Sequence, residues 1–414
     1  MFPRVMPLRE RAEVMRAVLR DRLDNLLPDL MTESGLDMWI VLCQEDDLDP
    51  VFRTMVPMDS WCPILQMLVF HRTPAGLERL NLSMTDTGDL YDRPWRGREP
   101  AEQWRLLAEL VRERDPQRIG INTGSVQWAA GGLTHNLYRQ LVGALGPELA
   151  ARLESAEPLA TRWLATLTET QIGLMEHVVN VAHALLRECY SRAAIIPGLT
   201  TTRDLEWCYW QRVADLGLEP SFKPFFVLVR SEQQRERHGP DDLTIRPGDV
   251  VHSDVGIRYL GLCSDHQQPA YILGPGETGA PAGWQELLAQ GNRLQDIYLG
   301  EFRAGLTGNE LLHNILSRAR QEGVPNPRVY SHSLGHLLHE PGPLIGLPWE
   351  QEACPGRGDV VLHPGYAFTM ELSVSGPVAE CGGQEMTLGL EEDVVFTEAG
   401  CRVLDGRLTE FHLV

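Results

Sequence analysis

An internal repeat is the feature that most constrains how the second half of this 414-residue chain can fold. The segments IIPGLTTTRDLEWCYWQRVADLGLEP (195–220) and EFRAGLTGNELLHNILSRARQEGVPNP (301–327) share a Gly-Leu-Thr followed by a helical pattern that ends at glycine. The tetrapeptide Gly-Asp-Val-Val then follows in each copy, at 248–251 and at 358–361. We therefore predict two copies of a unit in which helices precede antiparallel strands. Together they would form a curved sheet with helices outside and a pocket on the pseudo-two-fold axis.

The first part of the chain follows a different pattern. Residues 9–32 carry apolar side chains at helical spacing, while DMWIVLCQ (37–44) and LQMLVFHR (65–72) are typical of buried strands. RIGINTG (118–124) predicts a strand that runs into a turn. This alternation of helix and strand indicates an α/β domain, in which we find no catalytic cluster.

The periodicity changes near residue 165, where TETQIGLMEHVVNVAHALLREC begins a long helix with one apolar face. We place the domain boundary at this point. The sequence thus predicts an α/β N-terminal domain over 1–165 and an α+β domain over 166–414 that carries the duplication.

The composition limits which partners the protein can bind and which cellular compartment it is expected to occupy. The formal net charge of −20 argues against nucleic acid or an anionic membrane surface as the partner. No apolar run approaches the roughly 18 residues of a membrane span, and the charged N-terminus does not have the pattern of a signal peptide. The eight cysteines include no Cys-X-X-Cys pair and are typical of reduced thiols. We therefore expect a cytoplasmic protein.

Two acidic residues, Asp254 and Asp265, stand 11 positions apart in the first copy. Two strands joined by a turn would bring both carboxylates side by side, because alternate strand residues share a face. Like charges at that distance repel unless a proton or a cation neutralises them. Taken alone, such a pair is more often two unrelated surface or turn aspartates.

Histidines and glutamates stand out in the second copy. His332, His336 and His339 lie within YSHSLGHLLHEPGPLIG, whose glycines and prolines indicate an irregular loop. Imidazole is a good ligand for zinc, cobalt or iron. Glu371 lies in the strand-like run YAFTMELSV, and Glu391 opens the strand that follows MTLGL. A carboxylate in a strand that faces a core is costly unless it is paired or binds a metal.

The order Asp, Asp, His, Glu, Glu along these segments resembles the ligand pattern of the pita-bread metallopeptidase superfamily. Its members include methionine aminopeptidase, aminopeptidase P, prolidase and creatinase. The resemblance runs from residue 165 to the C-terminus and includes the duplication. The N-terminal part is similar to the creatinase-type domain of prolidase and aminopeptidase P. The matching ligands are Asp254, Asp265, His332, Glu371 and Glu391.

The resemblance implies a role for each ligand. Asp254 would chelate the first of two divalent ions, and Asp265 would bridge both ions. His332 and Glu371 would bind the second ion, while Glu391 would be the other bridge.

Spacing selects among the histidines within this resemblance. In proline-specific members a substrate-side histidine, followed by an acid, stands seven residues after the ligand histidine, and His339 before Glu340 stands seven after His332. His336 is then the weaker ligand candidate. His238, in RERHGPDD, matches a histidine that contacts the substrate or the developing oxyanion.

The implied enzyme is a dinuclear metallopeptidase that cleaves Xaa-Pro dipeptides or N-terminal Xaa-Pro bonds through a metal-bridging hydroxide. His238 and His339 would stabilise the oxyanion, and Glu371 would carry a proton to the leaving amine. Carboxylate-rich ligation favours manganese, while cobalt, zinc or iron would also fit. The resemblance further implies a homodimer whose partner is a small peptide substrate.

Three departures from the family pattern bear on the substrate. Gln267 and Gln268 stand where a Thr-Arg pair is usual, Leu372 replaces a proline, and Gly389 replaces an arginine that supports the active site. The five ligands themselves are unchanged.

Other interpretations keep the fold and change the activity. A creatinase-like enzyme would cleave another C–N bond without metal, and a metal-dependent enzyme could act on a different small molecule. A non-enzymatic binding module is a third class. Creatinase-like enzymes and binding modules have typically lost several ligands, whereas this chain has all five.

Overall fold

The computed structural model describes residues 2–97, 99–126 and 128–414, which form two compact units. The N-terminal unit is Met6–Thr168. The C-terminal unit comprises Glu169–Val414 together with the first residues of the chain up to Val5.

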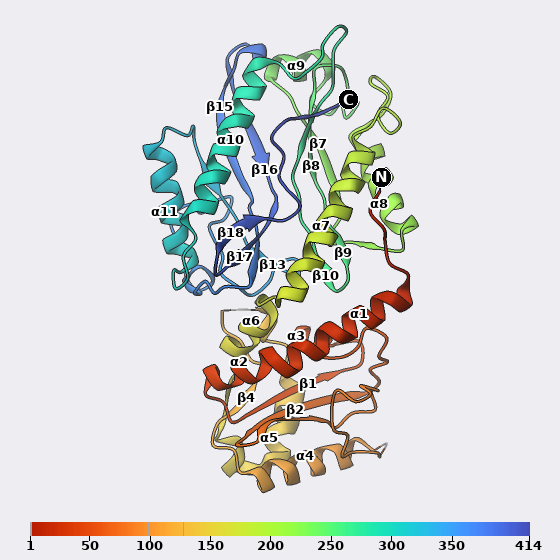
Figure 1. The fold of residues 1–414 in the computed structure, drawn as a ribbon, viewed down its shortest axis with the longest axis vertical. Coiled ribbons are helices and arrows are strands. Elements are labelled where there is room, and N and C mark those ends of the chain that lie inside the picture. The colour runs from red at the N-terminus through yellow and green to blue at the C-terminus, as the bar shows by residue number, and fades with distance from the viewer. Residues whose placement is uncertain (1, 98, 127) are drawn as a thin grey trace. The chain divides into compact units, whose positions relative to one another are not determined.

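The N-terminal unit is built on one sheet with strand order β3-β2-β1-β4-β5, with helices packed around it (Figure 1). In the sheet, β1 is antiparallel to β2 and parallel to β4. The strands are β1 (Met38–Gln44), β2 (Leu65–Thr73), β3 (Gly76–Asn81), β4 (Ile119–Ile121) and β5 (Leu153–Ser155). The helices are α1 (Leu8–Asp21), α2 (Leu27–Ser34), α3 (Pro50–Arg53), α4 (Pro100–Arg114), α5 (His135–Ala150) and α6 (Glu157–Ala165), with a π-helical turn at Arg22–Leu26 between α1 and α2.

Strand β1 is buried on both faces, which explains its unbroken apolar run. Met38 and Ile40 belong to the core that includes residues of α4 and α5. Trp39 and Val41 alternate with them toward the opposite face and are also buried. The strands expected at 37–44 and 65–72 are confirmed by β1 and β2.

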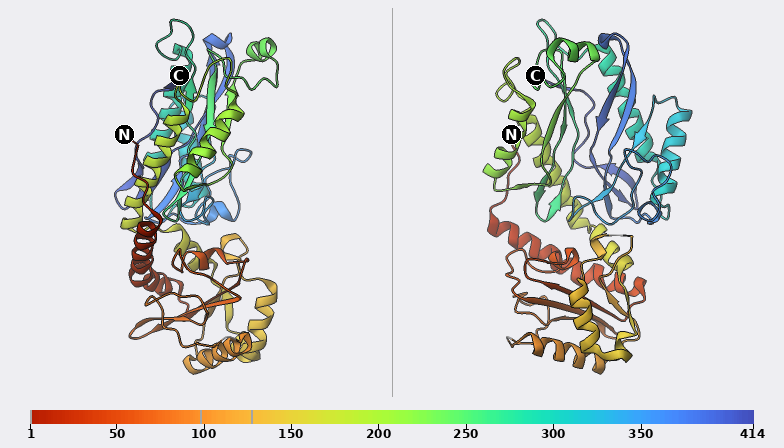
Figure 2. Two further views of the ribbon diagram at one scale, coloured as in Figure 1. Left: turned by 90° about the vertical axis from the view of Figure 1, so that its right-hand side faces the viewer. Right: turned by 180° about the vertical axis from the view of Figure 1, so that it is seen from behind.

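The C-terminal unit holds two groups of strands, each flanked by helices (Figure 1). The two further views show the same grouping, with the strands of both halves of the duplication near one another (Figure 2). Its helices are α7 (Glu169–Cys189), α8 (Thr202–Asp215), α9 (Glu232–His238), α10 (Ala282–Glu301) and α11 (Gly308–Gln321). The strands of its first half are β6 (Glu219–Pro220), β7 (Phe225–Val229), β8 (Val250–Asp254), β9 (Ile257–Tyr259), β10 (Leu262–Cys263) and β11 (Pro269–Tyr271). The later strands are β12 (Arg328–Val329), β13 (Ser333–Leu334), β14 (Tyr366–Thr369), β15 (Leu372–Val378), β16 (Gln384–Leu390), β17 (Asp393–Thr397), β18 (Gly400–Val403) and β19 (His412–Leu413).

The same capping signal starts the second helix of each repeat. Thr201 caps α8 and Thr307 caps α11, and each threonine side chain accepts a hydrogen bond from the backbone N–H three residues on. The acidic residues at those positions, Asp204 and Glu310, bond back to the capping residue and complete a capping box. The helix predicted after Gly-Leu-Thr in each copy is therefore confirmed.

One part of the predicted repeat needs correction. The second Gly-Asp-Val-Val opens no strand, because it overlaps a 3₁₀ turn at Arg357–Asp359. The counterpart of β8 is β14, which follows Gly365 as β8 follows Gly248. These glycines have φ of 90° and 85°, and each N–H donates to a carbonyl oxygen 2.7 Å away. Asp254 and Glu371 each follow their glycine by six residues, so the duplication makes them equivalent.

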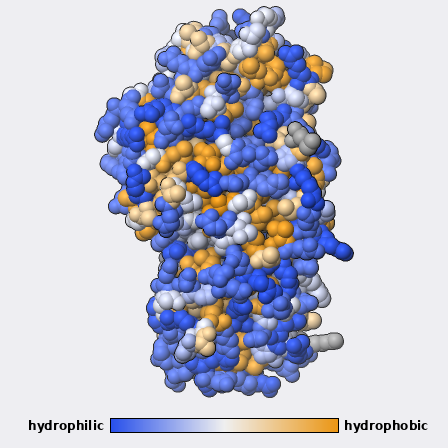
Figure 3. All heavy atoms as spheres, viewed as in Figure 1, coloured by the Kyte–Doolittle hydropathy of each residue, from blue (hydrophilic) through white to orange (hydrophobic). Residues whose placement is uncertain are grey.

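One face of the molecule carries both hydrophilic and hydrophobic residues (Figure 3). Hydrophilic residues cover much of the face seen in Figure 3, with hydrophobic residues exposed in patches between them. Within the described residues, we find no helix with the length and apolar character needed to cross a membrane.

Candidate metal centre

A hairpin brings the two aspartates of the first repeat together. Asp254 is the last residue of β8, and the chain returns through β9 and β10 to Asp265. The turn includes Gly261, whose φ of 74° suits the left-handed backbone of a tight reversal. Val255 and His266 then pair as an antiparallel bridge, so the carboxyls on either side of this pair become neighbours.

The two glutamates lie where the chain passes from one sheet to another. Glu371 falls in the break between β14 and β15 and not inside a strand as predicted, and Glu391 lies between β16 and β17, two residues before the strand that it was predicted to open. A run of apolar residues gives no sign of such a break, which explains the error. Gln267 forms hydrogen bonds with both glutamates. Its backbone exchanges hydrogen bonds of 2.9 and 3.1 Å with Glu391, and its Nε2 donates to Glu371 Oε1 at 2.6 Å.

His332 contributes a nitrogen to this group. Its Nε2 lies 3.7 Å from Asp265 Oδ2, and ligand atoms of His332, Asp265 and Glu391 all lie within 4.8 Å of one another. The Nδ1–H donates to the Ser333 carbonyl oxygen at 3.2 Å. That bond selects the tautomer in which Nε2 carries a free lone pair, as a metal ligand requires.

The other histidines of the loop have different surroundings. His339 is exposed, and its ring centroid lies 4.4 Å from that of His332. His336 instead contacts Gln171, with 2.9 Å between the Nε2 atoms, and its Nδ1 lies 3.7 Å from Glu340 Oε1. The loop from 335 to 344 is irregular, as its glycines and prolines predicted.

His238 stands apart from this group. It is the last residue of α9 and is half-buried. Among the described residues, no hydrogen bond or ion pair joins it to the other candidate site residues.

Electrostatics suit this cluster to a cation. Burial raises the pKa of Asp254 to about 6 and that of Glu371 to about 8. Burial, and then the neighbouring carboxylates, also raise the pKa values of Asp265 and Glu391. Asp265 Oδ1 and both Glu391 carboxylate oxygens are buried and have no hydrogen-bond partner among the described residues. Burial lowers the pKa of His332 to about 3, which keeps it neutral. Four carboxylates and one neutral imidazole are a donor set for divalent metal ions, so the residues fit such ions.

Two further residues complete the surroundings of the cluster. Gly389 faces Gln267 and His252, because a Cβ at this position would lie 3.2 Å from Gln267 Oε1 and 3.1 Å from His252 Cε1.

Arg357 lies near enough to His332 and His339 for its charge to lower both imidazole pKa values, after the larger effect of burial on each. Its Nε is buried without a hydrogen-bond partner among the described residues. Sequence reasoning missed Arg357 because it lies in a turn with no recognisable spacing to the ligands.

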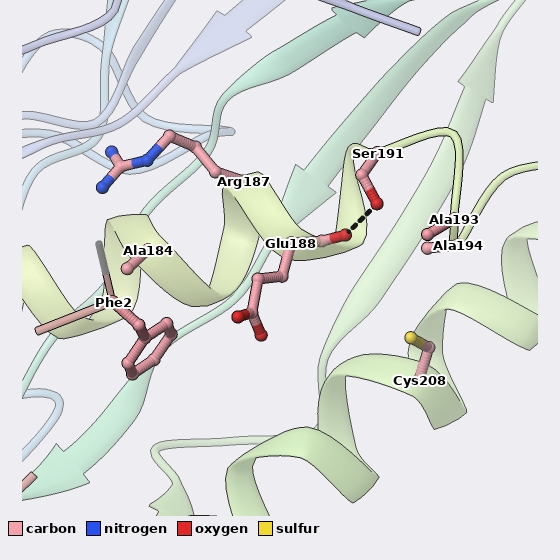
Figure 4. Close-up of a pocket in the computed structure, with 8 residues that line it drawn as sticks. All are labelled: Phe2, Ala184, Arg187, Glu188, Ser191, Ala193, Ala194 and Cys208. Atoms are coloured by element: carbon pink, nitrogen blue, oxygen red, sulfur yellow. Dashed lines mark hydrogen bonds between the residues drawn. The ribbon is translucent and has the colours of Figure 1, made fainter.

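A separate pocket of about 620 Å³ lies between α7 and α8 (Figure 4). There the Ser191 hydroxyl donates to the Glu188 carbonyl oxygen at 2.7 Å. The pocket contains none of the five predicted ligands. It is lined by Phe2, Ala184, Arg187, Glu188, Ser191, Ala193, Ala194 and Cys208.

Comparison with known proteins points to one family. The model of metallopeptidase family M24 matches residues 173–398. An uncharacterized peptidase of Bacillus subtilis, YqhT, is 29% identical over 305 residues, which cover 72% of this chain and 75% of that protein.

Solved structures resemble the whole chain. The X-Pro aminopeptidase of Thermotoga maritima aligns with a TM-score of 0.66 and 16% identity over 92% of this chain and 98% of that one. The Xaa-Pro dipeptidase of Bacillus anthracis aligns with a TM-score of 0.61 and 18% identity over 98% and 99% of the two chains. At these identities the likeness concerns the fold. The predicted α/β N-terminal region followed by a pita-bread domain is thus confirmed.

Proposed function

This chain belongs to metallopeptidase family M24, and from that premise we propose that it hydrolyses Xaa-Pro bonds in dipeptides or at the N-terminus of short peptides. Metal-dependent peptide hydrolysis follows from the family. The preference for proline is supported by the likeness to an X-Pro aminopeptidase and an Xaa-Pro dipeptidase and by the spacing of His332 and His339. The observation that carries the proposal is the buried cluster of all five ligand residues. For that reason a creatinase-like reaction without metal is not favoured.

Charge supports a centre with two ions. The cluster contains four carboxylates, from Asp254, Asp265, Glu371 and Glu391, and one neutral imidazole. One divalent ion would leave two negative charges uncompensated among buried groups, whereas two ions balance all four. Asp265 and Glu391 have buried carboxylate oxygens without a hydrogen-bond partner among the described residues, so in this proposal they would hold both ions. The many oxygen donors favour manganese, with cobalt, zinc or iron as alternatives.

The remaining residues bind and orient the peptide in this proposal. Bound divalent ions polarise the scissile carbonyl and lower the pKa of a water molecule. His339 is exposed beside His332, so its ring is accessible to a substrate carbonyl and can donate to the developing oxyanion. Glu371 would pass a proton to the leaving amine, while Gln267 holds its Oε1. His238 keeps its proposed contact with the substrate.

Arg357 is a candidate for recognising the carboxylate of a dipeptide. The arginine that usually stands at position 389 is absent, and Gly389 leaves that position without charge. Arg357 supplies a positive charge near His339, with a buried Nε that has no partner among the described residues. We expect Arg357→Leu to raise KM for Xaa-Pro but not for the amidated dipeptide, and an equal rise for both would remove this role.

The test is a substrate panel with defined metal content. Chelated protein is assayed with Xaa-Pro dipeptides, Xaa-Pro-Xaa tripeptides and matched Xaa-Ala peptides, before and after addition of manganese, cobalt or zinc. Asp265→Asn protein serves as the control for contaminating peptidases. We expect hydrolysis only with metal and a preference for proline. Full activity of metal-free protein would contradict the metal site, and equal cleavage of Xaa-Ala would contradict the proline preference.

We also propose a cytoplasmic homodimer. All eight cysteines are free, which agrees with a reducing compartment. The dimer rests on the resemblance to aminopeptidase P and prolidase, and light scattering of the purified chain would test it.

A further inference from the structure

A second group of buried metal-ligating side chains lies in the C-terminal unit and shares no residue with the five ligands. His183 comes from α7, His266 follows β10, and Glu392 lies between β16 and β17. Each offers one ligand atom, and these atoms all lie within 4.8 Å of one another. Their exposed fractions are 4%, 0% and 1%.

The alternation of side chains along an extended backbone explains why the same two segments carry residues of both metal-ligating groups. His266 follows Asp265 directly, and Glu392 follows Glu391. Successive side chains of an extended segment point to opposite faces. Asp265 and Glu391 therefore face the five-ligand cluster, while His266 and Glu392 face α7.

The distances suit a single ion. His183 Nε2 lies 3.0 Å from Glu392 Oε2, and His266 Nδ1 lies 3.7 Å from the same oxygen. In a tetrahedral zinc site with bonds of about 2.0–2.1 Å, neighbouring ligand atoms are about 3.4 Å apart. The observed separations lie on either side of this value.

His266 is otherwise unexplained. Both of its ring nitrogens are buried and lack a hydrogen-bond partner among the described residues. An imidazole in such surroundings is unfavourable unless a partner compensates for lost water. A metal ion would bind Nδ1, while Nε2 lies 3.6 Å from Asp393 Oδ2 and would donate toward it.

The outer contacts already orient the other two ligands. His183 Nδ1 lies 3.1 Å from Asp405 Oδ2, which is the carboxylate contact that metal-binding histidines commonly make through their second nitrogen. Glu392 Oε1 accepts hydrogen bonds of 2.8 Å from Gln268 Nε2 and from the Leu408 N–H. Glu392 Oε2 is thereby left facing both imidazoles.

We propose that His183, His266 and Glu392 bind one divalent transition-metal ion of the zinc class. Two imidazoles and a carboxylate are ligands that zinc prefers. The ion ties α7 to the two segments that carry Asp265 and Glu391, so its role is to hold those segments in position. A simple ion pair between His183 and the carboxylates would leave His266 without a partner.

Metal content tests the site when the five-ligand cluster is disabled. The full chain carrying Asp254→Asn and His332→Ala is dialysed against zinc alone, and bound zinc is measured by mass spectrometry. We expect that adding His266→Gln lowers the zinc content by about one ion per chain. Adding His313→Gln, at an exposed histidine on α11, should leave it unchanged. Equal zinc content with and without His266→Gln would overturn the proposal.

A second measurement needs no change at His266 and so avoids any folding defect. X-ray absorption of zinc bound to the doubly substituted chain should show two imidazole ligands at about 2.0–2.1 Å. Coordination by oxygen atoms alone would overturn the site. Neither measurement depends on peptidase activity, so failure here leaves the proposed function untouched.

Discussion

A buried carboxylate has protein hydrogen-bond donors around it in the N-terminal unit and other acidic groups around it in the C-terminal unit. Asp49 in the N-terminal unit is 1% exposed and Asp265 in the C-terminal unit is 5% exposed. Asp49 accepts hydrogen bonds from the Val51 N–H, the Phe52 N–H and Asn122 Nδ2 at 2.7, 3.2 and 3.0 Å. Asp265 Oδ1 has no such partner among the described residues and is surrounded by other acids.

This difference distinguishes a carboxylate with a structural role, Asp49, from one that is suited to binding a cation, Asp265. Hydrogen-bond donors reach both oxygens of Asp49 at the start of α3 and offset part of the cost of its burial, so this carboxylate has protein partners and needs no cation. The cluster around Asp265 gathers negative charge that protein donors leave largely uncompensated.

The bridging carboxylates should show the largest effect. Asp265→Asn and Glu391→Gln each remove a negative charge that, in our proposal, two ions share. We expect loss of at least one metal ion and a fall in turnover on the order of a thousandfold or more. Elemental analysis and steady-state kinetics measure both quantities. Normal metal content with near-normal turnover in both variants would refute the bridging roles.

Substitutions of the histidines should separate ligand from substrate roles. His332→Ala should lower metal occupancy together with turnover. His238→Ala and His339→Ala should keep their metal and lose about 10²–10³-fold in turnover, as the loss of one oxyanion donor does. His336, which contacts Gln171 and Glu340, should be replaceable by alanine with little change in either quantity.

The four histidine variants are best measured side by side for metal content and kinetics. The opposite pattern, with metal lost from His336→Ala and kept by His332→Ala, would show that the spacing argument chose the wrong histidine. The role of His339 would then weaken too.

Metal should stabilise the C-terminal unit. An ion that binds only the folded state adds about 2.7 kcal/mol at a concentration 100 times its Kd. We expect thermal unfolding of chelated protein to shift to higher temperature on adding manganese, with a smaller shift for Asp265→Asn. Identical shifts in the two proteins would place the stabilising ion elsewhere.

Asp49 should show the smallest effect and no link to metal. Burial outweighs its three hydrogen bonds and raises the pKa of Asp49 to about 6, above the usual value near 3.9. Its contribution to stability is therefore fully present below about pH 4 and is lost as the pH rises through 6. Between pH 7 and pH 5, wild type should gain about 1 kcal/mol over the non-titrating Asp49→Asn variant. Denaturant unfolding at both pH values measures this gain, and a change in metal content would contradict the contrast between the units.

Much of the fold was predictable because its signals are local. The apolar run of β1 and the Gly-Leu-Thr before each helix depend on residues close in sequence. The breaks at Glu371 and Glu391 were not predictable, since they arise where strands leave one sheet for another. The contact of Gln267 with Glu371 spans 104 positions and has no sequence signature.

The sequence by itself determined the order of the five ligands, the 11-residue spacing of the aspartates and the presence of a duplication, whereas the equivalence of Asp254 and Glu371 required the structural correspondence of β8 with β14. Backbone geometry sets these relations over short distances, because strand and helix periods decide which side chains share a face. Only the tertiary structure decided that His332 faces Asp265 while His336 faces Gln171. It alone joined His183, His266 and Glu392, since packing between distant segments decides which faces meet.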